Sequence, residues 1–219
     1  SVAACARQVG ITFLFAMTFH PSMRFVGPTR KMLGIPTAFN YLGPMTNPAR
    51  VSSSAIGVAN PQMVEKMAWV FANRGDHALV FRGDDGLDEL TIATTSQIWE
   101  ASGGTLQKYV FNPEGYGIER SSLDNLRGGD AEYNASVFRA VLAGEGESAK
   151  DSLHAIRNAV LINAAAGLIA YRKNDGRSFE ERYTEALADA RQSIDTGAAA
   201  QVLNAWVEFS HLVVETPSP

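Results

Sequence analysis

The segment Gly83–Leu90 reads G-D-D-G-L-D-E-L and holds four carboxylates within six residues, namely Asp84, Asp85, Asp88 and Glu89. These carboxylates repel one another, and a compact loop that held them without compensation would be destabilised. Mg²⁺ prefers oxygen ligands and commonly binds one or two carboxylates together with substrate phosphates. Asp88 and Glu89 are therefore candidate metal ligands, because an irregular loop would let both approach an ion. From the spacing alone, a solvated acidic turn is a slightly simpler interpretation.

The segment His20–Arg30, H-P-S-M-R-F-V-G-P-T-R, offers a candidate binding cation. Arg30 falls in a predicted helix, and a partly buried arginine can hold a carboxylate through two parallel hydrogen bonds, which lysine does less well. A surface cation or a structural ion pair is the alternative for Arg30. His20 fits a polar pocket wall, an acid–base group or, more simply, a hydrogen-bonded packing residue.

The segment Asn40–Pro48, N-Y-L-G-P-M-T-N-P, has the glycine and prolines of an irregular backbone. Such loops at the carboxyl edge of an α/β sheet are where ligands collect. Asn40 and Asn47 can either hydrogen-bond a ligand or brace the turn, and bracing is the favoured interpretation.

The composition describes an ordinary globular chain of 219 residues, with 46% hydrophobic residues. This length suits one sizeable core, so we expect a single α/β domain over residues 1–219. The net charge of −4 argues against broad binding of nucleic acid. No apolar run approaches the roughly 20 residues that span a bilayer, and residues 1–10 do not have the pattern expected of a secretory signal. With a lone cysteine, Cys5, these features predict a cytoplasmic protein without a membrane partner.

Short apolar runs alternate with amphipathic segments over the first two-thirds of the chain. This alternation predicts an α/β fold with a mixed, largely parallel sheet flanked by helices. Strands are expected at residues 11–16, 55–58, 78–81, 90–95, 97–101 and 105–111, the last three in part antiparallel. Helices are expected at residues 2–9, 21–33, 61–73, 130–142, 150–171, 179–195 and 198–214. Pro28 should kink or break the second of these helices.

Several segments together resemble a known family, the anthranilate phosphoribosyltransferases. They are G-I-T-F-L-F-A at residues 10–16, F-H-P-S-M-R at 19–24, P-T-R-K-M-L-G-I-P-T-A-F-N-Y-L-G-P-M-T-N-P-A at 28–49, D-G-L-D-E-L at 85–90, G-G-D at 128–130, N-A at 134–135 and I-N-A-A at 162–165. The combination of L-G-P-x-T-N-P with D-G-L-D-E is highly specific, and the match extends over nearly the whole chain. The resemblance implies the C-terminal domain fold that these enzymes share with nucleoside phosphorylases.

The resemblance also implies an activity and roles for particular residues. The family transfers the phosphoribosyl group of phosphoribosyl diphosphate to anthranilate in tryptophan biosynthesis and releases pyrophosphate. Arg30 looks like the arginine that holds the anthranilate carboxylate, and His20 and Met23 resemble residues that line the anthranilate channel. Asp88 and Glu89 look like the pair that binds Mg²⁺ with the diphosphate.

The family's glycine-rich phosphate-binding loop, its Lys-His-Gly-Asn-Arg segment and its small helical domain lie upstream of the position that matches Gly10. We therefore expect the chain to be the truncated catalytic domain of a longer two-domain enzyme, with little activity by itself. The family is typically homodimeric through the small helical domain, so the oligomeric state of this chain stays open. Two alternatives remain: an enzyme like the pyrimidine nucleoside phosphorylases, and a catalytically silent binding module of the same fold.

Overall fold

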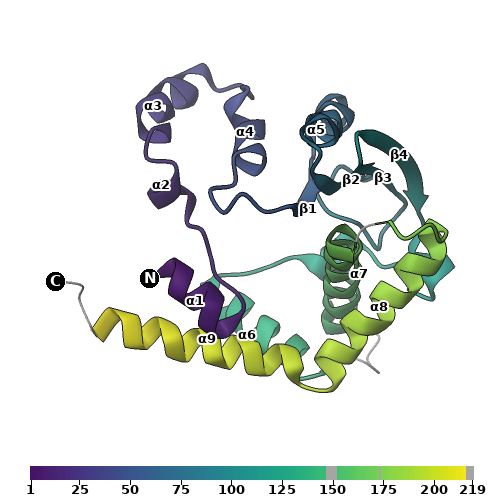
Figure 1. The fold of residues 1–219 in the computed structure, drawn as a ribbon. Helices are drawn as coiled ribbons and strands as arrows, with labels where there is room; N and C mark the ends of the chain where they lie inside the picture. Colours follow the sequence, from purple (N-terminus) through teal and green to yellow (C-terminus); the bar gives the residue numbers. More distant parts are fainter. Residues whose placement is uncertain (147–151, 173, 216–219) are drawn as a thin grey trace. The chain divides into compact units, whose positions relative to one another are not determined.

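The computed structural model describes residues 1–146, 152–172 and 174–215 (Figure 1). These residues form two compact units, each with its own internal contacts. The N-terminal unit comprises residues 1–50 together with the helix that follows Gly197, and the sheet unit comprises residues 51–196. The single domain expected over residues 1–219 remains a prediction, and the two units are described one at a time.

The sheet unit contains a four-stranded mixed sheet in the order β1-β2-β3-β4. The strands are β1 (Ser53–Gly57), β2 (His77–Gly83), β3 (Ser96–Ser102) and β4 (Thr105–Phe111). β1 and β2 are parallel, whereas β2–β3 and β3–β4 are antiparallel. The predicted α/β fold with a mixed sheet is confirmed, but fewer of the neighbouring strands run parallel than predicted. The reason is that only β1 and β2 are joined by a crossover helix, and the later strands follow one another through loops.

Helices cover both faces of this sheet. The helices of the sheet unit are α5 (Pro61–Arg74), α6 (Ala131–Leu142), α7 (Ser152–Arg172) and α8 (Phe179–Asp195), with short 3₁₀ turns at Pro113–Tyr116 and Leu123–Leu126. α6 packs on α7. α5 contacts β2, β3 and β4, while α7 contacts β1, β2 and α8. In Figure 1, α5 lies on one side of the sheet and α7 and α8 lie on the other. The helices predicted at 61–73, 130–142 and 179–195 are confirmed to within one residue at each end. The helix predicted at 150–171 is confirmed from residue 152, and its residues 150 and 151 lie outside the described part of the chain.

α7 is the central helix of the sheet unit. Among the described residues it is the one helix long and apolar enough to cross a membrane by length and composition. Half of that apolar window is buried inside the protein, and α7 packs against two strands and a second helix. It also buries the polar side chains of Arg157 and Asn158. These contacts are those of a core helix.

The N-terminal unit consists of helices and connecting segments. The helices are α1 (Val2–Val9), α2 (Ala16–Phe19), α3 (Met23–Leu33), α4 (Phe39–Met45) and α9 (Ala198–Glu215). α1 packs against α9, and α3 ends at Gly34, whose φ of 63° is the left-handed conformation that glycine adopts readily. Pro28 lies inside α3 without ending it, so the predicted break does not occur.

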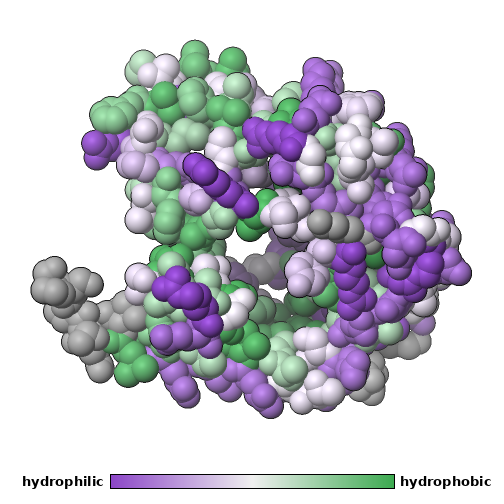
Figure 2. Space-filling view, in the orientation of Figure 1, coloured by the Kyte–Doolittle hydropathy of each residue, from purple (hydrophilic) through white to green (hydrophobic). Residues whose placement is uncertain are grey.

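The strand predicted at residues 11–16 is wrong. Residues 11–15 have no regular structure, and Phe13 is 64% exposed. A strand forms only when a neighbour satisfies its backbone, and no described strand pairs with this segment. Helices α2, α3 and α4 likewise bury no residue. Figure 2 shows apolar side chains on the surface of this part of the chain.

Candidate functional site

The acidic loop that follows β2 uses two of its four carboxylates to hold itself together. Asp84 accepts hydrogen bonds from Thr95 Oγ1 and from Gln97 Nε2, the latter at 3.1 Å. Asp85 Oδ1 accepts from the amide of Leu87 at 3.1 Å. These contacts explain how a sequence so rich in negative charge can form a defined turn.

The other two carboxylates, those of Asp88 and Glu89, are exposed. Within the described part of the chain, neither has a hydrogen bond or an ion pair with another side chain. No group of three or more His, Cys, Asp and Glu side chains that could hold a metal occurs among these residues. Asp88 and Glu89 are thus the two carboxylates of this loop that are not engaged by another described side chain.

The backbone of this loop is held at two points. The carbonyl of Asp88 lies so close to β1 that a β-carbon added to Gly57 would be 1.4 Å from its oxygen. At the next fixed point, the side-chain amide of Asn163 on α7 pairs with the backbone of Leu90. The strand predicted at residues 90–95 is wrong. The segment contains bends, and the backbone of Leu90 pairs with the side chain of Asn163 where a strand would pair with a neighbouring strand.

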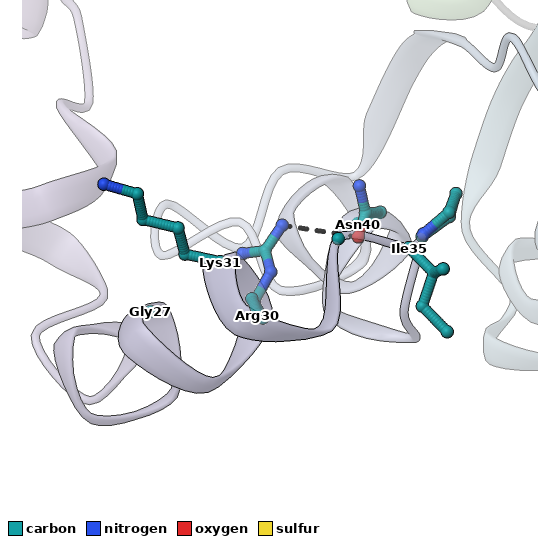
Figure 3. A pocket seen from close by; sticks show the side chains of 7 residues that line it. Gly27, Arg30, Lys31, Ile35 and Asn40 are labelled. Atoms are coloured by element: carbon teal, nitrogen blue, oxygen red, sulfur yellow. Dashed lines mark hydrogen bonds between the residues drawn. The ribbon is translucent and has the colours of Figure 1, made fainter.

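Arg30, near the end of α3, lies beside a pocket of about 370 Å³ in the N-terminal unit (Figure 3). The pocket is lined by Gly27, Arg30, Lys31, Gly34, Ile35, Pro36 and Asn40. Arg30 Nη2 donates to Asn40 Oδ1 at 3.3 Å, and the same oxygen accepts from the amide of Thr37 at 3.0 Å. Asn40 thus holds one edge of the guanidinium group, and the other nitrogen atoms remain available at a partly exposed position.

His20 directly follows the last residue of α2, and Met23 is the first residue of α3. The amide of Met23 donates to the carbonyl of His20 at 2.9 Å, and both residues are half-buried. Neither lines the pocket beside Arg30. The structure therefore does not bring these two residues together with Arg30, and their channel-lining role stays a prediction.

The two asparagines of the 40–48 segment brace the backbone, as predicted. Asn40 accepts from Thr37, and Asn47 Oδ1 accepts from the amide of Ala49 at 2.9 Å. Asn40 additionally orients Arg30, a pairing of residues ten positions apart that the sequence analysis did not identify. Lys31, the neighbour of Arg30 in the sequence, places a second cation at this pocket.

Comparison with known proteins gives consistent matches along the chain. The family model described as "Glycosyl transferase family, a/b domain" matches residues 1–200. An anthranilate phosphoribosyltransferase from Rhodococcus opacus is 50% identical over 95% of this chain and 56% of its own length. The anthranilate phosphoribosyltransferase structure from Thermus thermophilus is 36% identical, with a TM-score of 0.81, over 95% of this chain and 58% of that one.

Two structures of the anthranilate phosphoribosyltransferase from Saccharomyces cerevisiae, each 26% identical, are also similar. The complex with 4-fluoroanthranilate has a TM-score of 0.82 and matches 94% of this chain and 57% of the yeast chain. The complex with PRPP and Mg has a TM-score of 0.78 and matches 90% of this chain and 52% of the yeast chain. The chain thus spans a little over half the length of these relatives. With the family model matching most of its residues, the chain belongs to the glycosyl transferase family defined by this α/β domain.

Proposed function

We propose that this chain provides the acceptor-binding and metal-binding parts of an anthranilate phosphoribosyltransferase. The enzyme would transfer the phosphoribosyl group of phosphoribosyl diphosphate to anthranilate in the cytoplasm, as a step of tryptophan biosynthesis. Relatives with that name are 50% identical over 95% of the chain. The observation that carries the proposal is the pair Asp88 and Glu89, two exposed carboxylates on a loop whose backbone is fixed on both sides.

The donor set at the acidic loop fits Mg²⁺ bound together with a diphosphate. Asp84 and Asp85 are engaged within the loop, which leaves Asp88 and Glu89 as the two carboxylates available to a metal. Mg²⁺ commonly binds through one or two carboxylates, substrate phosphates and water, so a larger protein cage is unnecessary. When bound, the ion would neutralise the charge of the departing pyrophosphate. Asp88 and Glu89 would hold it, and the yeast relative has been observed with PRPP and Mg.

Arg30 would orient the acceptor. Its guanidinium is held on one side by Asn40, so the remaining N–H groups present a defined edge to a planar carboxylate. Lys31 adds a second positive charge at the same pocket. We assign His20 and Met23 to the wall of the path that the aromatic acid follows, in keeping with the resemblance described above.

In the proposed reaction the amine nitrogen of anthranilate forms a bond to C1 of the ribose, and the bond from C1 to pyrophosphate breaks. The nitrogen then loses a proton to solvent. The ribose carbon becomes cationic during this exchange, and an aromatic amine is already nucleophilic towards such a centre. Arg30 contributes by orientation, which lowers the barrier without proton transfer. No side chain is required as a general base.

The experiment is a calorimetric titration of the 219-residue chain with anthranilate. Binding is measured in place of turnover, because the phosphate-binding loop of the family does not occur within residues 1–219. We expect the wild-type chain to bind and Arg30→Ala to lose at least about tenfold in affinity, as for the loss of a charged hydrogen-bonding partner. The matched control is Arg24→Ala, an arginine of the same helix outside the pocket, which should bind as wild type. Equal affinity of the Arg30→Ala and Arg24→Ala variants would remove the role of Arg30. Thymidine phosphorolysis would instead support the nucleoside phosphorylase alternative.

A further inference from the structure

We propose that Asn163 of α7 is a positioning residue for the metal-binding pair Asp88 and Glu89. This inference rests on the proposed function, because it concerns how the chain presents those carboxylates to a metal–diphosphate unit. Asn163 itself touches neither carboxylate in the structure and acts through the backbone of Leu90.

The amide of Asn163 makes three hydrogen bonds, of which two tie the acidic loop to α7 and one stays within the helix. Its Oδ1 accepts from the amide of Leu90 at 3.0 Å, and its Nδ2 donates to the carbonyl of Leu90 at 3.0 Å. Nδ2 also donates to the carbonyl of Ala159, one turn earlier in the helix, at 2.9 Å. The side chain is therefore fixed to the helix while it holds both backbone groups of a single loop residue.

An asparagine is suited to this contact because its amide offers an acceptor and two donors in one plane. It satisfies Leu90 as a neighbouring strand would, at a place where the sheet has no strand. The side chain of Leu90 is 1% exposed, so the residue is anchored through its side chain as well as its backbone. An apolar side chain at position 163 would leave the buried N–H and C=O of Leu90 without these partners, which is costly.

The other anchor of the loop lies just before the two carboxylates. The amide of Gly83 donates to the carbonyl of Leu87 at 2.9 Å, and Asp88 packs against Gly57. Asp88 and Glu89 thus lie between two fixed points. Because consecutive Cα atoms are about 3.8 Å apart, a shift of Leu90 is transmitted directly to Glu89. The course of the backbone that carries Asp88 and Glu89 therefore depends in part on the contact with Asn163.

The test measures binding of Mn²⁺ with inorganic pyrophosphate to the 219-residue chain, by the electron paramagnetic resonance signal of the free ion. Asn163→Leu removes all three hydrogen bonds at similar volume. Asn163→Asp keeps the acceptor for the Leu90 amide but places a carboxylate oxygen against the carbonyls of Leu90 and Ala159. Residues that orient metal ligands typically contribute about 10–100-fold to metal affinity. We expect Asn163→Leu to weaken binding by about that factor, and Asn163→Asp to weaken it as well, because its carboxylate repels the two carbonyl oxygens to which Asn163 donates. Hydrogen exchange should show faster exchange of the Leu90 amide in Asn163→Leu.

Asn158→Ala is the matched control, since Asn158 is a buried asparagine of the same helix that bonds to His154 instead of the loop. It should change thermal stability without changing the affinity for Mn²⁺ and pyrophosphate. One result would overturn the positioning role and leave the proposed function standing. In that result Asn163→Leu binds Mn²⁺ and pyrophosphate as tightly as wild type, whereas the double variant Asp88→Asn/Glu89→Gln loses this binding. If wild type and Asp88→Asn/Glu89→Gln bind equally, the metal role of the pair fails, and the positioning role fails with it.

Discussion

Arg182 on α8 donates two parallel hydrogen bonds to Glu100 on β3, from Nη1 to Oε1 and from Nη2 to Oε2, each 2.8 Å long. Both side chains are almost fully buried, at 3% and 1% exposed. His77 on β2 approaches the same carboxylate, with Nε2 3.3 Å from Oε1, and its other ring nitrogen contacts the carbonyl of Ala170 on α7. One buried carboxylate thus connects two neighbouring strands with the helices that cover them.

We expect Glu100→Gln to destabilise the sheet unit strongly, because it leaves the positive charge of Arg182 buried without its counter-charge. Removing one partner of a buried ion pair typically costs about 3–5 kcal/mol. Urea unfolding followed by circular dichroism measures the change. Asp124→Asn serves as the control, because it removes an exposed pair with Arg127 and should cost less than about 1 kcal/mol. A loss no larger than that of the control would show that the buried pair does not stabilise the fold.

The same pair predicts a contribution to acid unfolding. Burial by itself would raise the pKa of Glu100, but hydrogen bonds and charge from Arg182 and His77 outweigh it and lower the pKa from 4.5 to about 2. A carboxyl whose pKa is lower in the folded state stabilises the fold above its unfolded pKa and loses that contribution as the pH falls. Stability should therefore decrease between pH 4.5 and about 2. In Glu100→Gln the decrease over this interval should be shallower, measured by urea unfolding at each pH.

The helices were predictable because their signals are local. Ser178 and Glu181 form a reciprocal capping box at the start of α8, and Asn60 caps α5 through its side chain. The helix ends at Gly34 and Gly75 likewise follow from the conformation that glycine allows. Each of these features involves residues within one turn of one another, so the sequence alone contains the information.

The strands and the site depend on contacts that spacing does not contain. Residues 11–15 have the composition of a buried strand, yet they form none because no described strand lies beside them. Asp88 and Glu89 could be singled out by residue type. The residues that hold their loop could not, because Asn163 is 73 positions from Leu90 and Gly57 lies on a different strand.

Gly57→Ala should displace the acidic loop. The new β-carbon would lie 1.4 Å from the carbonyl oxygen of Asp88, so the backbone of one segment must move. We expect a lower melting temperature and at least about tenfold weaker binding of Mn²⁺ with pyrophosphate, measured by scanning calorimetry and titration.

Gly167→Ala, on α7, is the matched control, because a β-carbon there meets nothing within 4 Å. Alanine in a helix is favoured over glycine by about 1 kcal/mol, so this control should be neutral or stabilising. Unchanged metal affinity in Gly57→Ala would contradict the close packing of the loop on β1.

Asn40→Ala should weaken binding of anthranilate while leaving the charge of Arg30 in place. Its Oδ1 holds Arg30 Nη2 at 3.3 Å and the Thr37 amide at 3.0 Å, so the substitution frees the guanidinium and loosens the start of α4. Without Asn40 the guanidinium would be mobile before anthranilate binds, and binding would have to order it at an entropic cost. We therefore expect a three- to tenfold loss of affinity, on the order of 1 kcal/mol. This loss should be smaller than that of Arg30→Ala. Calorimetric titration with anthranilate measures both variants.

Asn47→Ala is the control, because Asn47 braces the same segment through Ala49 but does not line the pocket. If Asn47→Ala weakens binding as much as Asn40→Ala, the effect comes from the backbone of the segment, and the orientation of Arg30 by Asn40 is not what sets the affinity.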